Sequence, residues 1–182
     1  VAAAGNSSSS EPHYPAAFEG VISVGAVNRF RALASYSNYG PTVDLVAPGG
    51  DGSGGVLSTS WTGTTTRGSP TYTAYNGTSM ASPHAAGVAA LVVGEGVTSP
   101  DAVEKILQES ARPPKNGKMN KERYGAGIID AEAAILKVRG QAGATELGLG
   151  ALIALGLAFS LRRRGMLGLK VGCTASSCMR PV

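Results

Sequence analysis

The chain has 182 residues, of which 43% are apolar and 15% charged, and its formal net charge is +4. This length fits one ordinary globular domain, and the apolar content excludes a fully disordered chain. The positive charge comes from the end of the chain, where seven of the 16 Lys and Arg residues follow position 136 and only Glu146 opposes them. The basic pI therefore does not indicate a nucleic-acid-binding protein.

Two continuous apolar runs predict buried parallel strands. Residues 20–27 and 43–49 do not alternate with polar residues, as is typical of strands covered on both faces. A shorter apolar run at 1–6 predicts another buried strand that ends in a turn. Residues 56–61 and 72–75 are predicted to form short strands that flank a polar loop.

Helices are predicted in the second half of the chain. A run of small apolar residues after Ser79 predicts a buried helix. The pair Ser99-Pro100 predicts the start of an amphipathic helix, because serine caps helices and proline suits the first helical position. Asp130 is expected to cap a last helix at 131–138.

Ser79 lies at the start of the predicted buried helix, shortly after the turn pair Asn76-Gly77. Backbone N–H groups in the first turn of a helix lack partners and favour negative charge. Such a position suits a hydroxyl that acts as a nucleophile with an oxyanion held beside it. The alternative is that Ser79 only caps the helix, and local physics does not separate the two.

The run Gly77-Thr78-Ser79-Met80-Ala81-Ser82-Pro83-His84-Ala85-Ala86-Gly87 resembles the nucleophile motif of the subtilisin-like serine proteases. Further segments resemble that family in the same order, at residues 3–6, 14–16, 21–26, 36–40, 44–49 and 124–131. The resemblance covers residues 1–138. It implies an α/β fold, a three-layer sandwich with a mostly parallel sheet. Because it covers only the C-terminal half of the family's catalytic domain, the fold is expected to be incomplete at the N-terminus.

The resemblance implies a serine endopeptidase that cleaves peptide bonds through an acyl-enzyme, with Ser79 as the nucleophile. Asn6 would donate its side-chain amide to the oxyanion together with the Ser79 backbone N–H, and Thr78 would support that hole. The pocket for the substrate residue before the cleaved bond would have one wall formed by Ala3, Ala4 and Gly5.

The catalytic Asp and His motifs of the family precede its oxyanion asparagine, and neither is present in this sequence. His84 follows Ser79 by five residues on one helix, a rotation of about 140° that turns the two side chains apart. A self-contained triad of Ser79, His13 and Asp44 is an alternative. An α/β-hydrolase is disfavoured, because Ala81 occupies the last position of the Gly-x-Ser-x-Gly elbow.

The chain alone is therefore expected to be inactive. Its expected partners are a peptide or protein substrate and the missing N-terminal half of the catalytic domain, with no nucleic acid. The competing interpretation is a catalytically inactive remnant that acts as a binding or structural piece, tethered to a membrane in one version. Because the chain begins at Val1, within an apolar run, a fragment or processed product is expected.

The resemblance also implies a structural cation site at Asp44, with backbone carbonyls from Ala16, Phe18 and Val21. Ligation by oxygen alone suits Ca²⁺ or a monovalent ion. The other interpretation of Asp44 is a plain surface or capping carboxylate. The chemistry itself requires no cofactor.

The composition changes at the end of the chain. Residues 139–146 are expected to form a linker, and residues 147–164 an apolar segment that ends in three arginines. This segment is a marginal candidate for a membrane or sorting anchor, and a loosely attached tail is the alternative. Residues 165–182 form a tail whose Cys173 and Cys178 could form a small disulfide. The expected location is secreted or at the cell surface.

Overall fold

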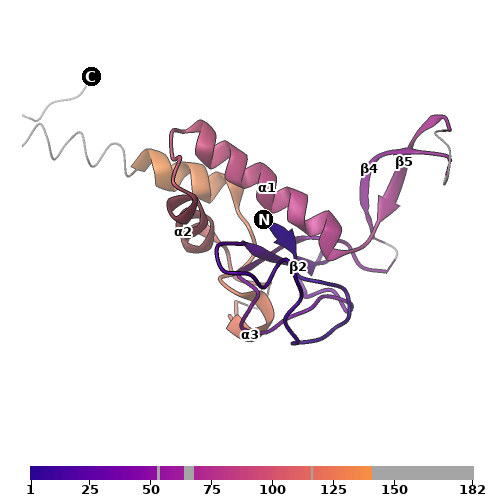
Figure 1. Cartoon of the computed structure of the whole chain (residues 1–182), viewed down its shortest axis with the longest axis horizontal. Coiled ribbons are helices and arrows are strands. Elements are labelled where there is room, and N and C mark those ends of the chain that lie inside the picture. Colours follow the sequence, from indigo (N-terminus) through magenta and orange to yellow (C-terminus); the bar gives the residue numbers. More distant parts are fainter. Residues whose placement is uncertain (53, 64–67, 116, 141–182) are drawn as a thin grey trace, which may run out of the picture. The chain divides into compact units, whose positions relative to one another are not determined.

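The computed structural model describes residues 1–52, 54–63, 68–115 and 117–140. Within these residues, short parallel strands precede a long helix, and a hairpin separates the two (Figure 1). The elements are β1 (Ala2–Ala3), β2 (Ser23–Val27), β3 (Leu45–Pro48), β4 (Val56–Trp61), β5 (Pro70–Tyr75), α1 (Thr78–Gly94), α2 (Pro100–Ser110) and α3 (Lys121–Tyr124), followed by a helix at 131–140.

The first three strands form a parallel sheet with β2 in the middle. Val24 in β2 pairs with Ala3 in β1 and with Leu45 in β3. Ile128 continues the sheet beyond β3 through a parallel bridge to Val46. All five residues of β2 are buried, because helices or loops cover both faces of the sheet. The prediction of continuous apolar strands in a parallel sheet is therefore confirmed.

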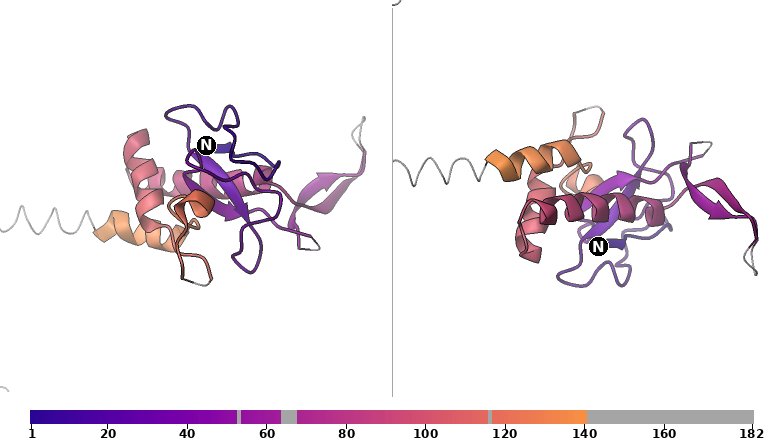
Figure 2. Two further views of the ribbon diagram at one scale, coloured as in Figure 1. Left: turned by 90° about the horizontal axis from the view of Figure 1, so that it is seen from below. Right: turned by 90° about the horizontal axis from the view of Figure 1, so that it is seen from above.

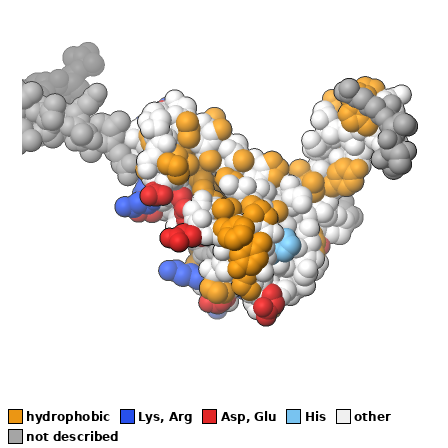
Figure 3. Space-filling model, in the orientation of Figure 1, with side chains coloured by type: hydrophobic (Ala, Val, Ile, Leu, Met, Phe, Trp, Pro, Cys, Tyr) orange, Lys and Arg blue, Asp and Glu red, His pale blue; other side chains and the backbone are white. Residues whose placement is uncertain are grey.

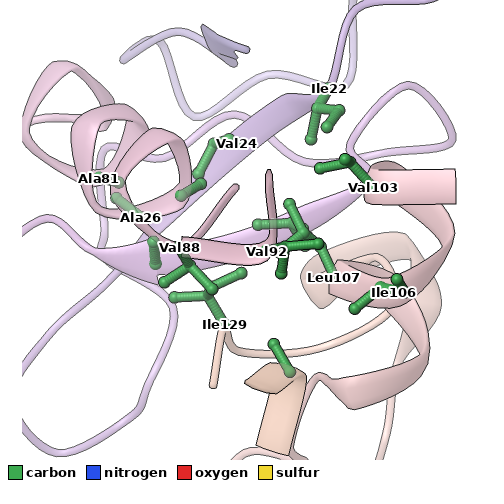
Figure 4. Close-up of a cluster of buried hydrophobic side chains, with 14 of the residues drawn as sticks. Ile22, Val24, Ala26, Ala81, Val88, Val92, Val103, Ile106, Leu107 and Ile129 are labelled. Carbon is green, nitrogen blue, oxygen red and sulfur yellow. The ribbon is translucent and has the colours of Figure 1, made fainter. Parts of the chain in front are cut away.

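The core lies on both faces of this sheet, because successive strand residues point to opposite sides. On one face Val24 and Leu45 pack against α1, α2 and the helix at 131–140 (Figure 4). On the other face Val27 and Val46 pack in a smaller cluster with Ala4, Val43 and Ile128. The predicted α/β fold class is confirmed by this arrangement, which sets α1 across the sheet (Figure 2).

Strands β4 and β5 form an antiparallel hairpin, with Val56 opposite Tyr75 and Trp61 opposite Pro70. The hairpin projects from the sheet and helices in each of the views (Figures 1 and 2). Its second strand leads through Asn76 and Gly77 directly into α1. The two short strands expected here are confirmed, and the hairpin stands next to the start of the helix that carries Ser79.

The helix ends agree in part with the expected caps. Asp130 caps the last helix, because its Oδ1 accepts a hydrogen bond of 3.0 Å from the Ala133 N–H. Ser99 occupies the N-cap position of α2, but its side chain makes no capping hydrogen bond. The side-chain cap expected at Ser99 is therefore wrong, and Pro100, which needs no N–H partner, begins the helix.

Candidate active site

Ser79 is the second residue of α1, and it is not a helix cap. The N-cap position belongs to Gly77, which makes no side-chain capping bond. The N–H groups of Met80 and Ala81 are both directed to the Gly77 carbonyl, at 3.0 and 3.3 Å. The alternative that Ser79 only caps the helix is therefore wrong. Its side chain is exposed in the first turn, where the helix dipole favours negative charge.

The Ser79 backbone N–H is free to bind an oxyanion as far as the described residues go, since none of them accepts a hydrogen bond from it. The preceding N–H, that of Thr78, is taken by Asn6 Oδ1 at 2.9 Å. The turn itself is held by the Gly77 N–H, which donates to the Gly49 carbonyl at 2.9 Å. Ser79 therefore presents both its hydroxyl and its N–H on a fixed turn.

The Asn6 carboxamide has one defined orientation. Its Oδ1 accepts two hydrogen bonds from Thr78, from the N–H at 2.9 Å and from the hydroxyl at 2.8 Å. Since two donors occupy the oxygen, Nδ2 remains as the donor of this side chain. Nδ2 lies 3.6 Å from the point that a Cβ on Gly77 would occupy, and the Ser79 nitrogen lies 3.7 Å from the same point. Both donors thus flank Gly77.

Thr78 links this amide to the sheet. Its hydroxyl accepts a hydrogen bond of 3.2 Å from the Gly5 N–H while it donates to Asn6. Thr78 is fully buried, so water does not compete for either bond. Gly5 follows β1 with φ +106°, a conformation that L side chains rarely adopt. The end of β1 is therefore fixed to the start of α1 through one hydroxyl.

The predicted wall residues Ala3, Ala4 and Gly5 lead directly into Asn6. Ala4 is buried in the smaller core cluster, and Ala3 is partly exposed. A cavity of about 350 Å³ next to Ser79 is lined by other residues, namely Val56, Leu57, Ser58, Met80, Pro83 and His84. The role of the wall residues stays a prediction.

Asn38 supports the loop after Asn6, and sequence reasoning assigned it no role. It is 4% exposed, and its Oδ1 accepts the N–H groups of Ser7 at 2.8 Å and Ser9 at 3.3 Å. Its own N–H donates to the Gly5 carbonyl at 2.9 Å. The only signal in the sequence was its place in the family-like run at 36–40.

Neither histidine is a base for Ser79 within the described residues. His84 lines the same cavity as Ser79, but its Nδ1 lies 2.8 Å from the Met80 carbonyl on its own helix. His13 is exposed beside Gly5. In the part of the chain that the structure describes, no hydrogen bond joins either ring to the Ser79 hydroxyl or to Asp44. The geometry gives no support to a Ser79–His13–Asp44 triad.

The residues predicted for the cation site lie together. Ala16, Phe18, Val21 and Asp44 line one cavity of about 280 Å³, which Glu104 of α2 also lines. Asp44 Oδ2 accepts the Ser23 N–H at 2.7 Å. Burial raises the pKa of the Asp44 carboxyl, and this hydrogen bond only partly opposes it. Burial, followed by the charge of Asp44, also raises the pKa of Glu104.

The cation site stays a prediction, although two carboxylates, of Asp44 and Glu104, line this cavity. Burial without a counterion disfavours the charged forms of Asp44 and Glu104. A bound cation would remove this free-energy penalty. The described residues hold no group of three or more His, Cys, Asp or Glu side chains that could bind a metal ion. A cation bound by Asp44 would therefore need backbone carbonyl oxygens as its other ligands. Ca²⁺ accepts ligands of this kind.

The sequence model of the subtilase family matches residues 1–127. The chain belongs to this family. The matched residues include the end of β1, the residues that line the Asp44 cavity and the start of α1. The candidate site therefore lies within the part of the chain that the family model covers. The resemblance to subtilisin-like proteases is confirmed.

Three subtilase relatives match this chain over 59–75% of its length. It is 46% identical over 138 residues to an extracellular protease of Xanthomonas campestris, covering 74% of this chain and 23% of that protein. It is 52% identical over 108 residues to a thermophilic serine proteinase of a Bacillus species, covering 59% and 24%. A solved protease structure from Pseudoalteromonas arctica has a TM-score of 0.69 at 40% identity and covers 75% of this chain and 41% of that one.

The chain thus spans about a quarter of the length of these two curated relatives. The subtilisin-like fold is shared by the part that matches. The linker was predicted at 139–146, but the last helix includes residues 139 and 140. The rest of that linker, the apolar segment 147–164 and the tail 165–182 with its two cysteines lie outside the described residues. Among the residues that are described, no helix has the length and apolar character needed to cross a membrane.

Proposed function

We propose that this chain supplies the nucleophile and the oxyanion hole of a serine endopeptidase. The observation that carries this proposal is the Asn6 carboxamide, whose oxygen is held by two Thr78 donors so that Nδ2 is left for a ligand. A helix cap would not require such an arrangement. An oxyanion hole requires donors that are fixed before the reaction begins.

Each described group has a defined part in the proposed reaction. The Ser79 hydroxyl attacks the carbonyl carbon of the scissile peptide bond and gives up its proton to a base. The developing oxyanion accepts hydrogen bonds from Asn6 Nδ2 and the Ser79 N–H. Loss of one such donor costs about 10²–10³ in kcat, a magnitude established for the asparagine of a subtilisin itself. The protonated base then gives this proton to the leaving amine, which departs as an acyl-enzyme forms on Ser79. Water, deprotonated by the same base, hydrolyses the acyl-enzyme.

The base and its orienting carboxylate are proposed to come from a polypeptide that packs against α1. This helix is apolar around its circumference, which is typical of a helix buried on all sides. Leu91 and Val93 are nevertheless 53% and 46% exposed. The exposed side of α1 extends back to Pro83 and His84, which line the Ser79 cavity. We propose that an element covering this side would restore burial and carry a histidine to the Ser79 hydroxyl.

The competing function is a catalytically inactive binding or structural piece. It is favoured by one observation, that no hydrogen bond joins Ser79 to either histidine among the described residues. In that case the exposed α1 face would serve a partner that brings no base. The two functions differ in what happens to Ser79 when a base is supplied.

The test is labelling of Ser79 with a peptidyl phosphonate. The isolated chain is expected to remain unlabelled, because its serine has no base. Co-refolding with the N-terminal half of a subtilisin catalytic domain, which carries the Asp and His, is expected to restore labelling in the native chain and not in Ser79→Ala. Labelling of the isolated chain would contradict the absence of a base, and no labelling in a folded complex would favour the inactive piece.

The proposed substrates are peptides or proteins, and the proposed location is outside the cell. The location rests on the Xanthomonas relative, which is named an extracellular protease. A structural cation, Ca²⁺ or a monovalent ion, is proposed at Asp44 with the carbonyls of Ala16, Phe18 and Val21. This site would stabilise the fold and would take no part in the chemistry.

A further inference from the structure

A further cavity lies between the loop at 28–32 and the segment at 114–124. It has a volume of about 500 Å³, and the residues that line it are Phe30, Arg31, Ala32, Pro114, Lys115 and Tyr124. A cavity of this size is typical of ligand sites. None of these residues lines the cavity beside Ser79 or the cavity at Asp44. This cavity, here called the basic pocket, is therefore a separate candidate site.

The loop at 28–32 is a tight turn that holds Phe30 outward. The Asn28 Oδ1 accepts the N–H groups of Phe30 at 3.0 Å and of Ala32 at 3.1 Å. Backbone hydrogen bonds of 2.9 Å also join Asn28 to Arg31 and to Ala32. Phe30 is 56% exposed, and the guanidinium carbon of Arg29 lies 4.9 Å from the centre of its ring. The aromatic wall of the pocket therefore has a cation against one face.

Arg31 has a backbone conformation that is unfavourable for arginine. Its φ is +62°, in the left-handed region that favours glycine. Residues held in such a conformation cluster at binding and catalytic sites, where the surrounding structure maintains the strain. The exposed Arg31 side chain lines the basic pocket. Arginine at this position thus supplies a positive charge to the pocket at the cost of backbone strain.

Tyr124 joins the second wall of the pocket to the first. Its hydroxyl accepts the Leu33 N–H at 3.2 Å, directly after the loop at 28–32, and Tyr124 packs against the smaller core cluster. Pro114 is buried, and its carbonyl accepts the Gly117 N–H at 2.9 Å. Both walls are therefore fixed before any ligand arrives, which lowers the entropic cost of binding.

Positive charge is concentrated around this pocket. Residues 1–136 contain nine Lys and Arg residues, and six of them lie at 28–32 or 114–124, where Glu122 is the only carboxylate. In the space-filling view, the visible Lys and Arg side chains lie at the left and lower left of the described part, away from the projecting hairpin (Figure 3). Among the described residues, neither Arg31 nor Lys115 forms an ion pair. Both charges are therefore available to an anionic ligand.

We propose that the basic pocket binds a peptide segment of a partner protein in which an apolar side chain is flanked by carboxylates. The apolar side chain packs against Phe30, Pro114 and Tyr124, which bury it from water. The carboxylates contact Arg31 from one loop and Lys115 from the other, in agreement with the charge of the surrounding surface. This inference goes beyond the proposed function and does not depend on it.

Two other occupants fit the pocket less well. The end of this chain is repelled, because residues 137–182 contain seven Lys and Arg residues and one carboxylate. A nucleic acid would be attracted by the same charges. However, the uncharged side chains that line the pocket offer base edges only the Tyr124 hydroxyl, which already accepts the Leu33 N–H. An acidic peptide with an apolar side chain uses both the charged and the apolar parts of the pocket.

The experiment measures binding of labelled peptides to the full 182-residue protein by fluorescence anisotropy. The probe is an acetylated and amidated peptide that has a central Phe with one Glu on each side and an uncharged dye. Matched probes have Gln in place of both Glu residues, or Ala in place of Phe. The acidic probe is expected to bind about fivefold more tightly than the Gln probe at low salt and to lose this advantage at high salt. It should bind about tenfold more tightly than the Ala probe, and equal affinities would overturn the proposal.

Variants locate the binding to the basic pocket. Arg31→Gly and Lys115→Gln are each expected to weaken the acidic probe by about twofold to fivefold, and Phe30→Ser by about tenfold. Circular dichroism should show all three folded, because these side chains are exposed and glycine adopts a positive φ readily. Lys105→Gln on α2, outside the pocket, removes the same charge and should leave binding unchanged. An equal loss in Lys105→Gln would indicate an effect of net charge alone and would overturn the proposal.

Two further measurements test the identity of the occupant. An oligothymidylate of the same length that binds more tightly than the acidic probe would assign the pocket to nucleic acid and overturn the proposal. A dimer in sedimentation velocity that dissociates in Phe30→Ser would assign the pocket to a second copy and overturn it likewise. Binding of the acidic probe is expected to be unchanged in Ser79→Ala. Failure of the pocket and failure of the proposed peptidase function are therefore distinguished by separate measurements.

Discussion

Thr78 donates twice to the carboxamide oxygen of Asn6, through its N–H at 2.9 Å and its hydroxyl at 2.8 Å. The same hydroxyl accepts the Gly5 N–H at 3.2 Å. A buried threonine thereby fixes the end of β1, the orientation of Asn6 and the first turn of α1. The position of the oxyanion donors and the stability of this junction depend on the same bonds.

Thr78→Val is expected to lower the free energy of unfolding by about 1–3 kcal/mol, because it leaves the buried Gly5 N–H without an acceptor. Thr78→Ser keeps the hydroxyl and should cost less. Urea denaturation of both variants measures the difference. Equal stability of the valine and serine variants would show that the hydroxyl does not hold the junction.

Gly5→Ala is expected to destabilise the fold more than Gly20→Ala. Both glycines have positive φ, +106° and +76°, so each alanine carries a backbone cost of order 1–3 kcal/mol. Only at Gly5 would the new Cβ lie 2.5 Å from Asn38 Nδ2, whereas at Gly20 it would meet nothing within 4 Å. Thermal unfolding of the pair isolates the steric part, and equal losses would rule it out.

Asp44→Asn is expected to abolish stabilisation by Ca²⁺. Burial raises the pKa of Asp44, so without a cation its contribution to stability falls as pH rises from the unfolded pKa through the raised folded pKa. A bound cation reverses this penalty once the carboxylate is charged. Ca²⁺ should therefore raise the Tm of the native chain at neutral pH and not in mild acid.

The asparagine variant retains an oxygen to accept the Ser23 N–H, so it should fold normally. Asp101→Asn, at an exposed carboxylate in the first turn of α2, is the matched control and should keep the full Ca²⁺ response. A Ca²⁺-dependent Tm in Asp44→Asn equal to that of the native chain would place the ion elsewhere.

Arg139→Lys is expected to loosen the last helix slightly. Arg139 binds Glu95 with two bonds, at 2.7 Å from Nη2 and 3.0 Å from Nε, and lysine cannot make both. The pair is solvent-exposed, so amide exchange in the helix at 131–140 should accelerate by only about twofold to fivefold. Lys137→Arg, which keeps the charge at a neighbouring ion pair, should leave exchange unchanged.

The Arg139–Glu95 pair also makes the stability of the last helix depend on pH. The hydrogen bond from Arg139, and secondarily its charge, lowers the pKa of Glu95 below its usual value of 4.5. A lowered acid pKa contributes stability that is present above the unfolded pKa and lost as pH falls through the folded pKa. The expected result is a fall in the exchange protection factors of the native protein below about pH 4.5 that is absent in Glu95→Gln. An equal acid response in both would exclude this pair as its source.

The sequence by itself determined the parts of this protein that depend on near neighbours. The valine-rich runs at 20–27 and 43–49 predicted buried parallel strands because both faces of such strands are apolar. The nucleophile run and the family-like segments before it predicted the subtilase family, and Asp130 predicted the last helix cap. The local rule failed at Ser99, whose side chain makes no capping hydrogen bond although serine is a preferred N-cap residue. At Ser79 the local rule left capping and nucleophile open, and the structure places the N-cap at Gly77.

Only the tertiary structure decided how the candidate site is assembled. Asn6 and Thr78 are 72 residues apart, and their contact exists because the parallel register brings the end of β1 to the start of α1. The amide orientation and the Asp44 cavity likewise join segments distant in the chain. Local propensity contains no information about such contacts, because their geometry is set by strand register and by packing across the sheet.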